Sequence, residues 1–184
     1  MIEKGYLIYA NNNSKCNYVR QAYALSLSIK YFNKDAHVTV VTENTLCERL
    51  RAGFDDVIVP NKAPISQSVL NSEQRIHAYN ISPYLKTIVM DADVLVTQNL
   101  DSWWNYLEKY MIYYVSDART YRDEKSDSIS YRKTFVENQL PNLYNAFHYF
   151  EKSDEASRFF RLQQMIVENW QKFYSKYHKW NFLE

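Results

Sequence analysis

The sequence predicts an α/β fold with a mostly parallel sheet flanked by helices. Through the first two-thirds of the 184 residues, short apolar runs alternate with segments whose apolar residues repeat every three or four positions. Polar clusters follow several of these runs, which is typical of strands whose carboxyl ends form one ligand-binding edge. No internal repeat or linker is visible, so we expect one domain over residues 1–184.

Each expected element has its own signal. Strands are expected where apolar, often β-branched runs occur, at residues 6–10, 37–42, 56–60, 87–90, 111–115 and 143–150. Helices are expected where an apolar stripe repeats at helical spacing, at residues 18–32, 46–52, 72–79, 100–110 and 154–177. Gly53 ends the second helix, and Pro83 prevents the third helix from continuing into the fourth strand. Ser153 is a good N-cap for the last helix. The polar residues 118–133 are expected to form a loop.

Composition and charge exclude several classes of protein. The 22 Lys and Arg residues nearly balance 21 Asp and Glu residues, and a net charge of +1 does not suit a domain built mainly to grip nucleic acid. Gly5 and Gly53 are the two glycines, which rules out a glycine-rich phosphate loop. The two cysteines imply no disulfide framework, and no apolar run reaches the length of a membrane span. We expect a cytoplasmic protein without a membrane anchor.

Two carboxylates stand in the apolar run Val89-Met90-Asp91-Ala92-Asp93-Val94. Burying an unpaired carboxylate is costly, and two carboxylates one residue apart repel each other. A divalent cation resolves both problems, and Mg²⁺ or Mn²⁺ takes such oxygen ligands together with phosphate oxygens. On a regular strand Asp91 and Asp93 would point to the same side, so we expect them to share a metal ion. A pair of turn or cap aspartates is the alternative.

The segment around these aspartates resembles a known family. Residues 86–96, continuing through Asn99-Leu100-Asp101, look like the Asp-x-Asp segment of the glycogenin and bacterial lipopolysaccharide galactosyltransferase family. In outline the similarity covers residues 6–174. It implies a GT-A fold, with a Rossmann-like nucleotide-binding sheet. It also implies transfer of a hexosyl or pentosyl group from a nucleotide-diphosphate sugar, a UDP-sugar favoured, with Mn²⁺ or Mg²⁺ on Asp91 and Asp93.

The resemblance and the strand ends together nominate the other site residues. Arg75 lies sixteen residues before Asp91, where the family commonly has a cation that contacts the donor; a surface helix cation is the alternative. Asn145 resembles the family's Asn that faces the donor sugar. Asp117 follows a strand and either faces the sugar, orients Arg75 or caps the strand. Asp117 and Asn145 are the catalytic candidates. The donor-binding candidates are Tyr9, Asn11, Asn12, Asn13, Arg75 and Ala92.

Two departures separate this sequence from the family pattern. Ala146-Phe147 replaces the family's Ser-Gly, which alters the sugar side of the pocket. The sequence ends at Glu184, before the point at which the family has an Asp-Gln segment and a metal-binding His. His148 and His178 stand outside that motif and are interpreted as ordinary residues.

The last expected helix carries a wide apolar stripe. It contains several large side chains, and Trp170, Trp180 and Phe182 add aromatic surface at its end. Such residues are seldom left in water. We expect that the chain either lacks a C-terminal segment or forms a homodimer.

Two other functions fit the same pattern. A catalytically inactive module could bind a nucleotide-sugar through the aspartates alone. A phosphatase of the haloacid dehalogenase type also places Asp-x-Asp after an apolar strand, although its first aspartate normally lies on the first strand.

The low-glycine, Asn- and Tyr-rich composition resembles that of tailed-phage proteins. A phage protein would act in the host cytoplasm, and modified DNA would then be one candidate acceptor.

Overall fold

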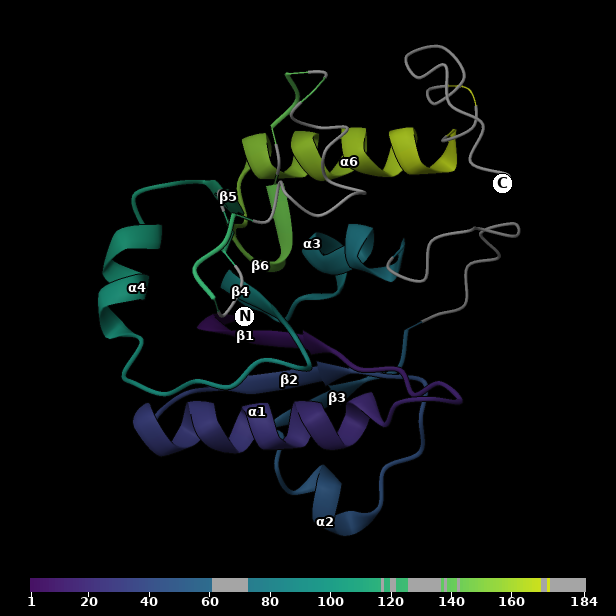
Figure 1. Cartoon of the computed structure of the whole chain (residues 1–184), viewed down its shortest axis with the longest axis vertical. Helices are drawn as coiled ribbons and strands as arrows, with labels where there is room; N and C mark the ends of the chain where they lie inside the picture. The colour runs from purple at the N-terminus through teal and green to yellow at the C-terminus, as the bar shows by residue number, and fades with distance from the viewer. Residues whose placement is uncertain are drawn as a thin grey trace.

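A six-stranded sheet with helices on both faces forms the centre of the computed structural model (Figure 1). The structure describes residues 1–60, 73–116, 118–119, 122–125, 137, 139–141, 143–169 and 172. The strands are β1 (Ile2–Tyr9), β2 (Val38–Val41), β3 (Asp56–Ile58), β4 (Tyr84–Asp91), β5 (Ile112–Ser116) and β6 (Leu143–Glu151). The helices are α1 (Tyr18–Phe32), α2 (Glu48–Arg51), α3 (Ala78–Ile81), α4 (Asp101–Leu107), α6 (Asp154–Glu168) and the 3₁₀ helix η1 (Glu73–His77).

The strand order is β3-β2-β1-β4-β6-β5, and β6 runs against the direction of the other five. The prediction of a mostly parallel α/β sheet is therefore confirmed, with one reversed strand that the sequence pattern did not indicate. The chain winds outward from β1 to β3 and then returns to place β4 on the other side of β1. This reversal makes the carboxyl ends of β1 and β4 a topological switch point, where α/β sheets bind their ligands.

Helices cover the two faces of the sheet from different parts of the chain. Helix α1 and helix α4 pack on one face, where Leu25, Ile88 and Trp104 share a buried cluster. Helices α3 and α6 lie on the opposite face (Figure 1), where Ala78 and Phe160 pack against strand residues. Among the described residues, none of the helices combines the length and the apolar content that crossing a bilayer requires.

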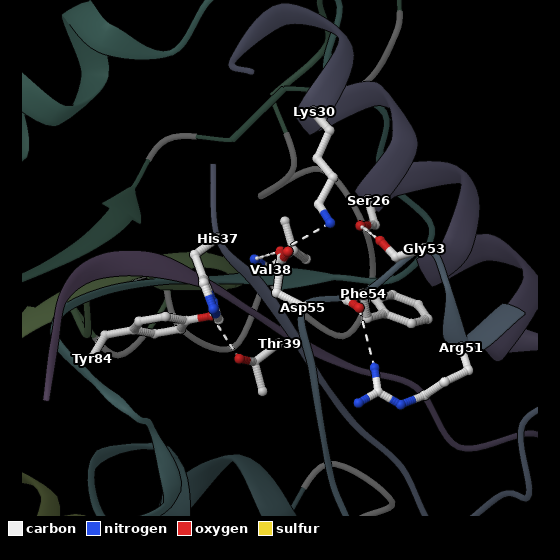
Figure 2. A network of polar contacts seen from close by, with 10 residues as sticks. All are labelled: Ser26, Lys30, His37, Val38, Thr39, Arg51, Gly53, Phe54, Asp55 and Tyr84. Carbon is white, nitrogen blue, oxygen red and sulfur yellow. Dashed lines mark hydrogen bonds and ion pairs between the residues drawn. The ribbon is translucent and has the colours of Figure 1, made fainter. Parts of the chain in front are cut away.

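A buried tyrosine fixes the alignment of the central strands. The ring of Tyr84, the first residue of β4, lies against Gly5 of β1, where a Cβ would come within 2.3 Å of the ring. Its hydroxyl is 2.6 Å from Thr39 Oγ1 and 2.8 Å from His37 Nδ1 (Figure 2). Tyr84 therefore ties β4 to β1 and β2 at the end of the sheet opposite to the switch point. The resulting register places Tyr9 beside Asp91.

Several element boundaries differ from the predicted ones for local reasons. Strand β1 begins at Ile2 rather than at residue 6, because Ile2 already pairs with Tyr84. The helix expected at residues 72–79 is the short η1 followed by α3. The helix expected at residues 154–177 ends at Glu168, because Asn169 caps it through its main chain and its side chain, both bonded to the Met165 carbonyl.

Part of the predicted C-terminal stripe can be located. Phe160 is buried, whereas Leu162 and Met165 are 52% and 44% exposed. Trp170, Trp180 and Phe182 lie outside the described residues, as does most of the predicted loop at 118–133. The expectation of a missing segment or a homodimer therefore stays a prediction.

Candidate functional site

The site begins at the carboxyl ends of β1 and β4. Tyr9 and Asp91 are the last residues of these two parallel strands, and they are register partners. Side chains of directly paired residues point to the same face of a sheet, and here that is the face covered by α3 and α6. Burial raises the pKa of Tyr9 well above its usual value, and the Arg75 charge only partly opposes this effect. The Tyr9 hydroxyl has no hydrogen-bond partner among the described residues.

Arg75 provides the positive charge of this site. It lies on η1, and its guanidinium forms an ion pair with Asp91 Oδ1. The two side chains keep 22% and 24% of their surface exposed. Burial raises the pKa of Asp91, the Arg75 charge lowers it, and the Asp93 charge raises it, with a net upward shift. The effect of burial on the Asp91 carboxyl is therefore larger than the opposing effect of the guanidinium.

Asp91 and Asp93 do not sit on one strand as expected. Strand β4 ends at Asp91, and Ala92 and Asp93 form a turn. Ala92 is buried against the α1 face of the core, and this anchors the turn. Asp93 is exposed, and its charge raises the pKa of Asp91, so the two carboxylates are electrostatic neighbours. A regular strand through Asp93, on which the predicted common orientation rested, is therefore not present, and that Asp91 and Asp93 share a metal ion stays a prediction.

The carboxylate pair has the chemistry that a hard divalent cation needs. One carboxylate is partly buried and the other is open to solvent. No group of three or more His, Cys, Asp or Glu side chains suited to a metal occurs in the part of the chain that the structure describes. Mg²⁺ and related ions often use one or two carboxylates and complete their shell with phosphate oxygens and water. Asp91 and Asp93 fit that pattern.

The three asparagines after β1 build the loop that leads to α1. Asn11 Oδ1 accepts from the Glu43 main chain at 2.8 Å, and Asn12 Oδ1 accepts from the main chain of Val19 at 3.0 Å. Asn13 Oδ1 accepts from two consecutive main-chain N–H groups, of Lys15 and Cys16. The Asn13 oxygen therefore shapes the loop itself, whereas Asn12 ties the loop to the start of α1 and Asn11 ties it to the segment after β2. The loop lies at the switch point, next to the ends of β1 and β4.

Asn145 reaches the same place from β6. Arg75 Nη1 is 3.4 Å from the Asn145 carbonyl oxygen, and the Asn145 side-chain oxygen is enclosed without a partner among the described residues. The pairing of β6 with β5 is irregular here, because its register shifts between Tyr114 and Val115. Such irregularities often redirect side chains next to a site. Asp117, the other catalytic candidate, lies outside the described residues.

His148, which the sequence analysis interpreted as an ordinary residue outside the family motif, also lies in this region. It is 1% exposed, pairs in register with Val89 of β4, and stacks on Tyr114 with ring centroids 4.8 Å apart. Neither ring nitrogen has a hydrogen bond of standard geometry to the described residues. Burial lowers the pKa of His148 to about 3, the Asn145 main chain opposes the shift, and the Arg75 charge adds to it. A signal was present in the sequence, since His148 interrupts the apolar run at residues 146–150.

A separate aromatic hollow lies over α4 and β5. It has a volume of about 340 Å³ and is lined by Ser102, Trp103, Tyr106 and Tyr113. Tyr113 packs against the core on the α1 face of the sheet, whereas Asp91 and Arg75 face α3 and α6. The neighbouring residues Tyr113 and Tyr114 therefore have different surroundings: Tyr114 packs on His148, and Tyr113 lines the hollow.

The fold of this chain resembles that of solved structures, although its sequence matches no family model. No protein-family model matches the sequence, and no curated protein matches it either. Solved structures do match. The glycosyltransferase GlyE of Streptococcus pneumoniae TIGR4 superposes with a TM-score of 0.60 and 13% identity, over 97% of this chain and 40% of GlyE.

Two further glycosyltransferases give the same result. Mouse xyloside xylosyltransferase 1 has a TM-score of 0.60 and 14% identity, over 97% of this chain and 77% of that one. The galactosyltransferase LgtC, solved with donor and acceptor sugar analogues, has a TM-score of 0.53 and 15% identity, over 89% of this chain and 66% of LgtC. The chain thus spans only part of the length of these proteins. The sheet topology and these superpositions identify its fold as the GT-A fold of glycosyltransferases, as the sequence resemblance implied.

Proposed function

We propose that this chain is a metal-dependent glycosyltransferase, which moves a hexosyl or pentosyl group from a nucleotide-diphosphate sugar to an acceptor hydroxyl. The observation that carries the proposal is the ion pair of Arg75 with Asp91 at the end of β4. In a GT-A sheet this is the switch point, where the ligand is expected. A guanidinium there matches the geometry and charge of a phosphate group, and we propose a UDP-sugar as the donor.

The chemistry assigns one task to each side chain. The bond between the anomeric carbon and the diphosphate oxygen breaks, a bond to the acceptor oxygen forms, and the acceptor hydroxyl releases its proton. Mn²⁺ or Mg²⁺, held by Asp91 and Asp93, would supply charge neutralisation for the leaving diphosphate. Arg75 adds a fixed positive charge beside it. We assign the Asn145 amide to the donor sugar, and Asp117 to the sugar or to the orientation of Arg75.

The donor's nucleoside would lie against the loop after β1. Because the side-chain oxygens of Asn11, Asn12 and Asn13 hold this loop together, we assign to them the shaping of the surface that receives the base or ribose. We assign to Tyr9 and Ala92, which are both buried, the support of that surface from below, one from β1 and one from the turn after β4. Action in the cytoplasm, a homodimer and modified DNA as the acceptor are predictions from the sequence.

A hydrolysis panel tests the activity. Glycosyltransferases of this kind are assayed without an acceptor by the slow release of nucleoside diphosphate from UDP-sugars in the presence of Mn²⁺. We expect release by the wild type, and a loss of about 100-fold or more in Asp93→Asn, as expected when a metal ligand is removed. Asp35→Asn is the matched control, because Asp35 is an exposed aspartate in the turn before β2. Equal release by the wild type and Asp93→Asn would contradict the proposal.

The same panel separates the two other functions. Hydrolysis of p-nitrophenyl phosphate without release from nucleotide-sugars would favour a phosphatase, although the GT-A fold argues against that class. Mn²⁺-dependent binding of UDP without any turnover would favour a catalytically inactive module. The inactive module is the second candidate function, because this chain spans 40% of the length of GlyE.

A further inference from the structure

Building on the proposed function, we propose that Arg75 exchanges one anion for another during donor binding. It neutralises Asp91 before the donor arrives, and it moves to the diphosphate when the donor binds. The divalent cation and the diphosphate would then bind strongly together and weakly one at a time. Arg75 would therefore set the order in which the ligands occupy the site, in addition to contacting the donor.

The Arg75 guanidinium lies close to where a cation bound to Asp91 would lie. It contacts Oδ1 of Asp91, which is one of the two oxygen atoms that Asp91 can offer to a cation. Both side chains are about three-quarters buried, so little water screens them from each other. A cation bound to Asp91 would lie within a few ångströms of the guanidinium, where two positive charges repel strongly. A cation alone must therefore compete with Arg75 for the same carboxylate.

The charges at the proposed metal site do not cancel when a cation binds without the diphosphate. Asp91 and Asp93 contribute two negative charges, Arg75 contributes one positive charge, and a divalent cation contributes two. The total is one excess positive charge in a partly buried place, which is unfavourable. A nucleoside diphosphate brings at least two negative charges and reverses the sign. It also gives the guanidinium a new anionic partner with bidentate geometry.

The contacts of Arg75 with the described residues leave its side chain free to move. Besides the ion pair with Asp91, these residues give it one long contact, 3.4 Å from Nη1 to the Asn145 carbonyl oxygen, and η1 is a single short 3₁₀ helix. Two acceptor atoms nearby, the Tyr9 hydroxyl and the Asn145 side-chain oxygen, have no partner among the described residues. The Arg75 charge is close enough to influence the pKa of Tyr9. A guanidinium that leaves Asp91 could therefore donate to the Tyr9 hydroxyl or to the Asn145 side-chain oxygen.

Titration of Mn²⁺, followed by the electron paramagnetic resonance signal of the free ion, tests this proposal without requiring turnover. The proteins are the wild type, Arg75→Gln, Arg75→Lys and the control Arg158→Gln, which removes an exposed cation from α6. Each is titrated with and without saturating UDP. In the wild type, we expect UDP to increase the Mn²⁺ affinity at least about tenfold, and reciprocity requires Mn²⁺ to increase the UDP affinity by the same factor.

Arg75→Gln should uncouple the two ligands. We expect its affinity for Mn²⁺ alone to rise at least about fivefold, while the factor by which UDP increases that affinity shrinks. Arg75→Lys keeps the charge and loses the planar fork, so it should shift in the same direction by less and carries the comparison if Arg75→Gln does not fold. Arg158→Gln should match the wild type. Unchanged or weaker binding of Mn²⁺ alone by both Arg75 variants would overturn the exchange, even if UDP binding in the wild type requires Mn²⁺.

Failure of the proposed function would give a different result. The wild type would then bind Mn²⁺ with the same affinity with and without UDP, and Asp93→Asn would behave like the wild type. That outcome would remove the metal site and the exchange together. Coupling that disappears in Asp93→Asn but persists in full in both Arg75 variants would support the metal site and reject only the exchange.

Discussion

The ring of Tyr84 lies so close to Gly5 that a Cβ at residue 5 would be 2.3 Å from Cε1 of the ring. Tyr84 is fully buried and bonded through its hydroxyl, so the ring cannot swing aside. Gly5→Ala should therefore lower the free energy of unfolding by about 1–3 kcal/mol, the usual cost of overpacking. Urea denaturation provides the measurement.

Gly53→Ala is the matched control for that substitution. A Cβ at Gly53 would also meet a tyrosine ring, at 2.4 Å, but Tyr23 is only half-buried and its ring can move. The cost at Gly53 should therefore be smaller than at Gly5. Equal costs at both positions would show that the fixed Tyr84 ring is not what limits residue 5.

Two buried tyrosines should respond in opposite ways to loss of the hydroxyl. Tyr84→Phe leaves the buried Thr39 hydroxyl without its partner and should cost about 1–3 kcal/mol of unfolding free energy. Tyr9→Phe removes a hydroxyl that has no partner among the described residues, so it should leave stability unchanged or raise it slightly. Thermal or urea unfolding of both variants, in the absence of ligands, decides this. A large loss in Tyr9→Phe would mean that its hydroxyl has a partner after all.

The buried His148 should make the fold sensitive to acid. Its pKa is about 3 in the folded chain against an ordinary 6.5, so the unfolded state takes up a proton first. The stability that neutral His148 contributes is complete above pH 6.5 and is lost as the pH falls toward 3, at up to about 1.4 kcal/mol per pH unit. Asp91 acts in the opposite direction, because its pKa is raised and its protonation favours the folded state.

His148→Phe and His148→Gln both remove this titration. In each variant, the free energy of unfolding should fall less steeply than in the wild type between pH 6.5 and pH 4.5. The phenyl ring can also keep the stacking on Tyr114. Urea denaturation at several pH values gives the slopes directly. Slopes in both variants that equal the wild-type slope would show that His148 is not buried in its neutral form.

The metal dependence of nucleotide binding should reside in Asp93. We expect UDP to bind more tightly with Mn²⁺ than without it in the wild type, and with one low affinity under both conditions in Asp93→Ala. The reason is that a cation held by Asp91 and Asp93 would supply positive charge to the diphosphate. Isothermal titration calorimetry with and without Mn²⁺ measures both affinities, and Asp35→Ala serves as the exposed control. Equal wild-type affinities under the two conditions would contradict a metal-bridged diphosphate.

The sequence was informative where local pattern decides structure. The alternation of apolar runs and helices predicted the parallel part of the sheet and put Asp91 at a strand end, because both depend on periodicity. It did not indicate that β6 is reversed, since the direction of an inserted strand depends on contacts made far along the chain. The turn at Ala92-Asp93 was only the alternative interpretation for a related reason: a strand's end depends on pairing partners, and the hydrophobic run continues beyond it.

The site was predictable in part for the same reasons. Arg75 was nominated by a family resemblance, and its contact with Asp91 joins residues sixteen positions apart on different elements, which no periodicity reports. The asparagines of the first loop were donor-binding candidates, and in the structure their side-chain oxygens accept hydrogen bonds from the main chain of the loop, of α1 and of the segment after β2. His148 was interpreted as an ordinary residue because a single histidine in an apolar run carries no motif, and only packing shows how deeply it is buried.

The strand order also has a consequence for the newly made chain. Strand β5 leaves the ribosome before β6, yet in the described part of the chain its sheet partner is β6, which lies between β4 and β5. Until residue 151 has emerged, the edge of β4 that ends in Asp91 and the whole of β5 have no neighbour to pair with. Such open edges invite pairing with other chains. Translation arrested before β6 should therefore yield an aggregation-prone intermediate, and β6 acts as the closing piece that completes both the sheet and the site.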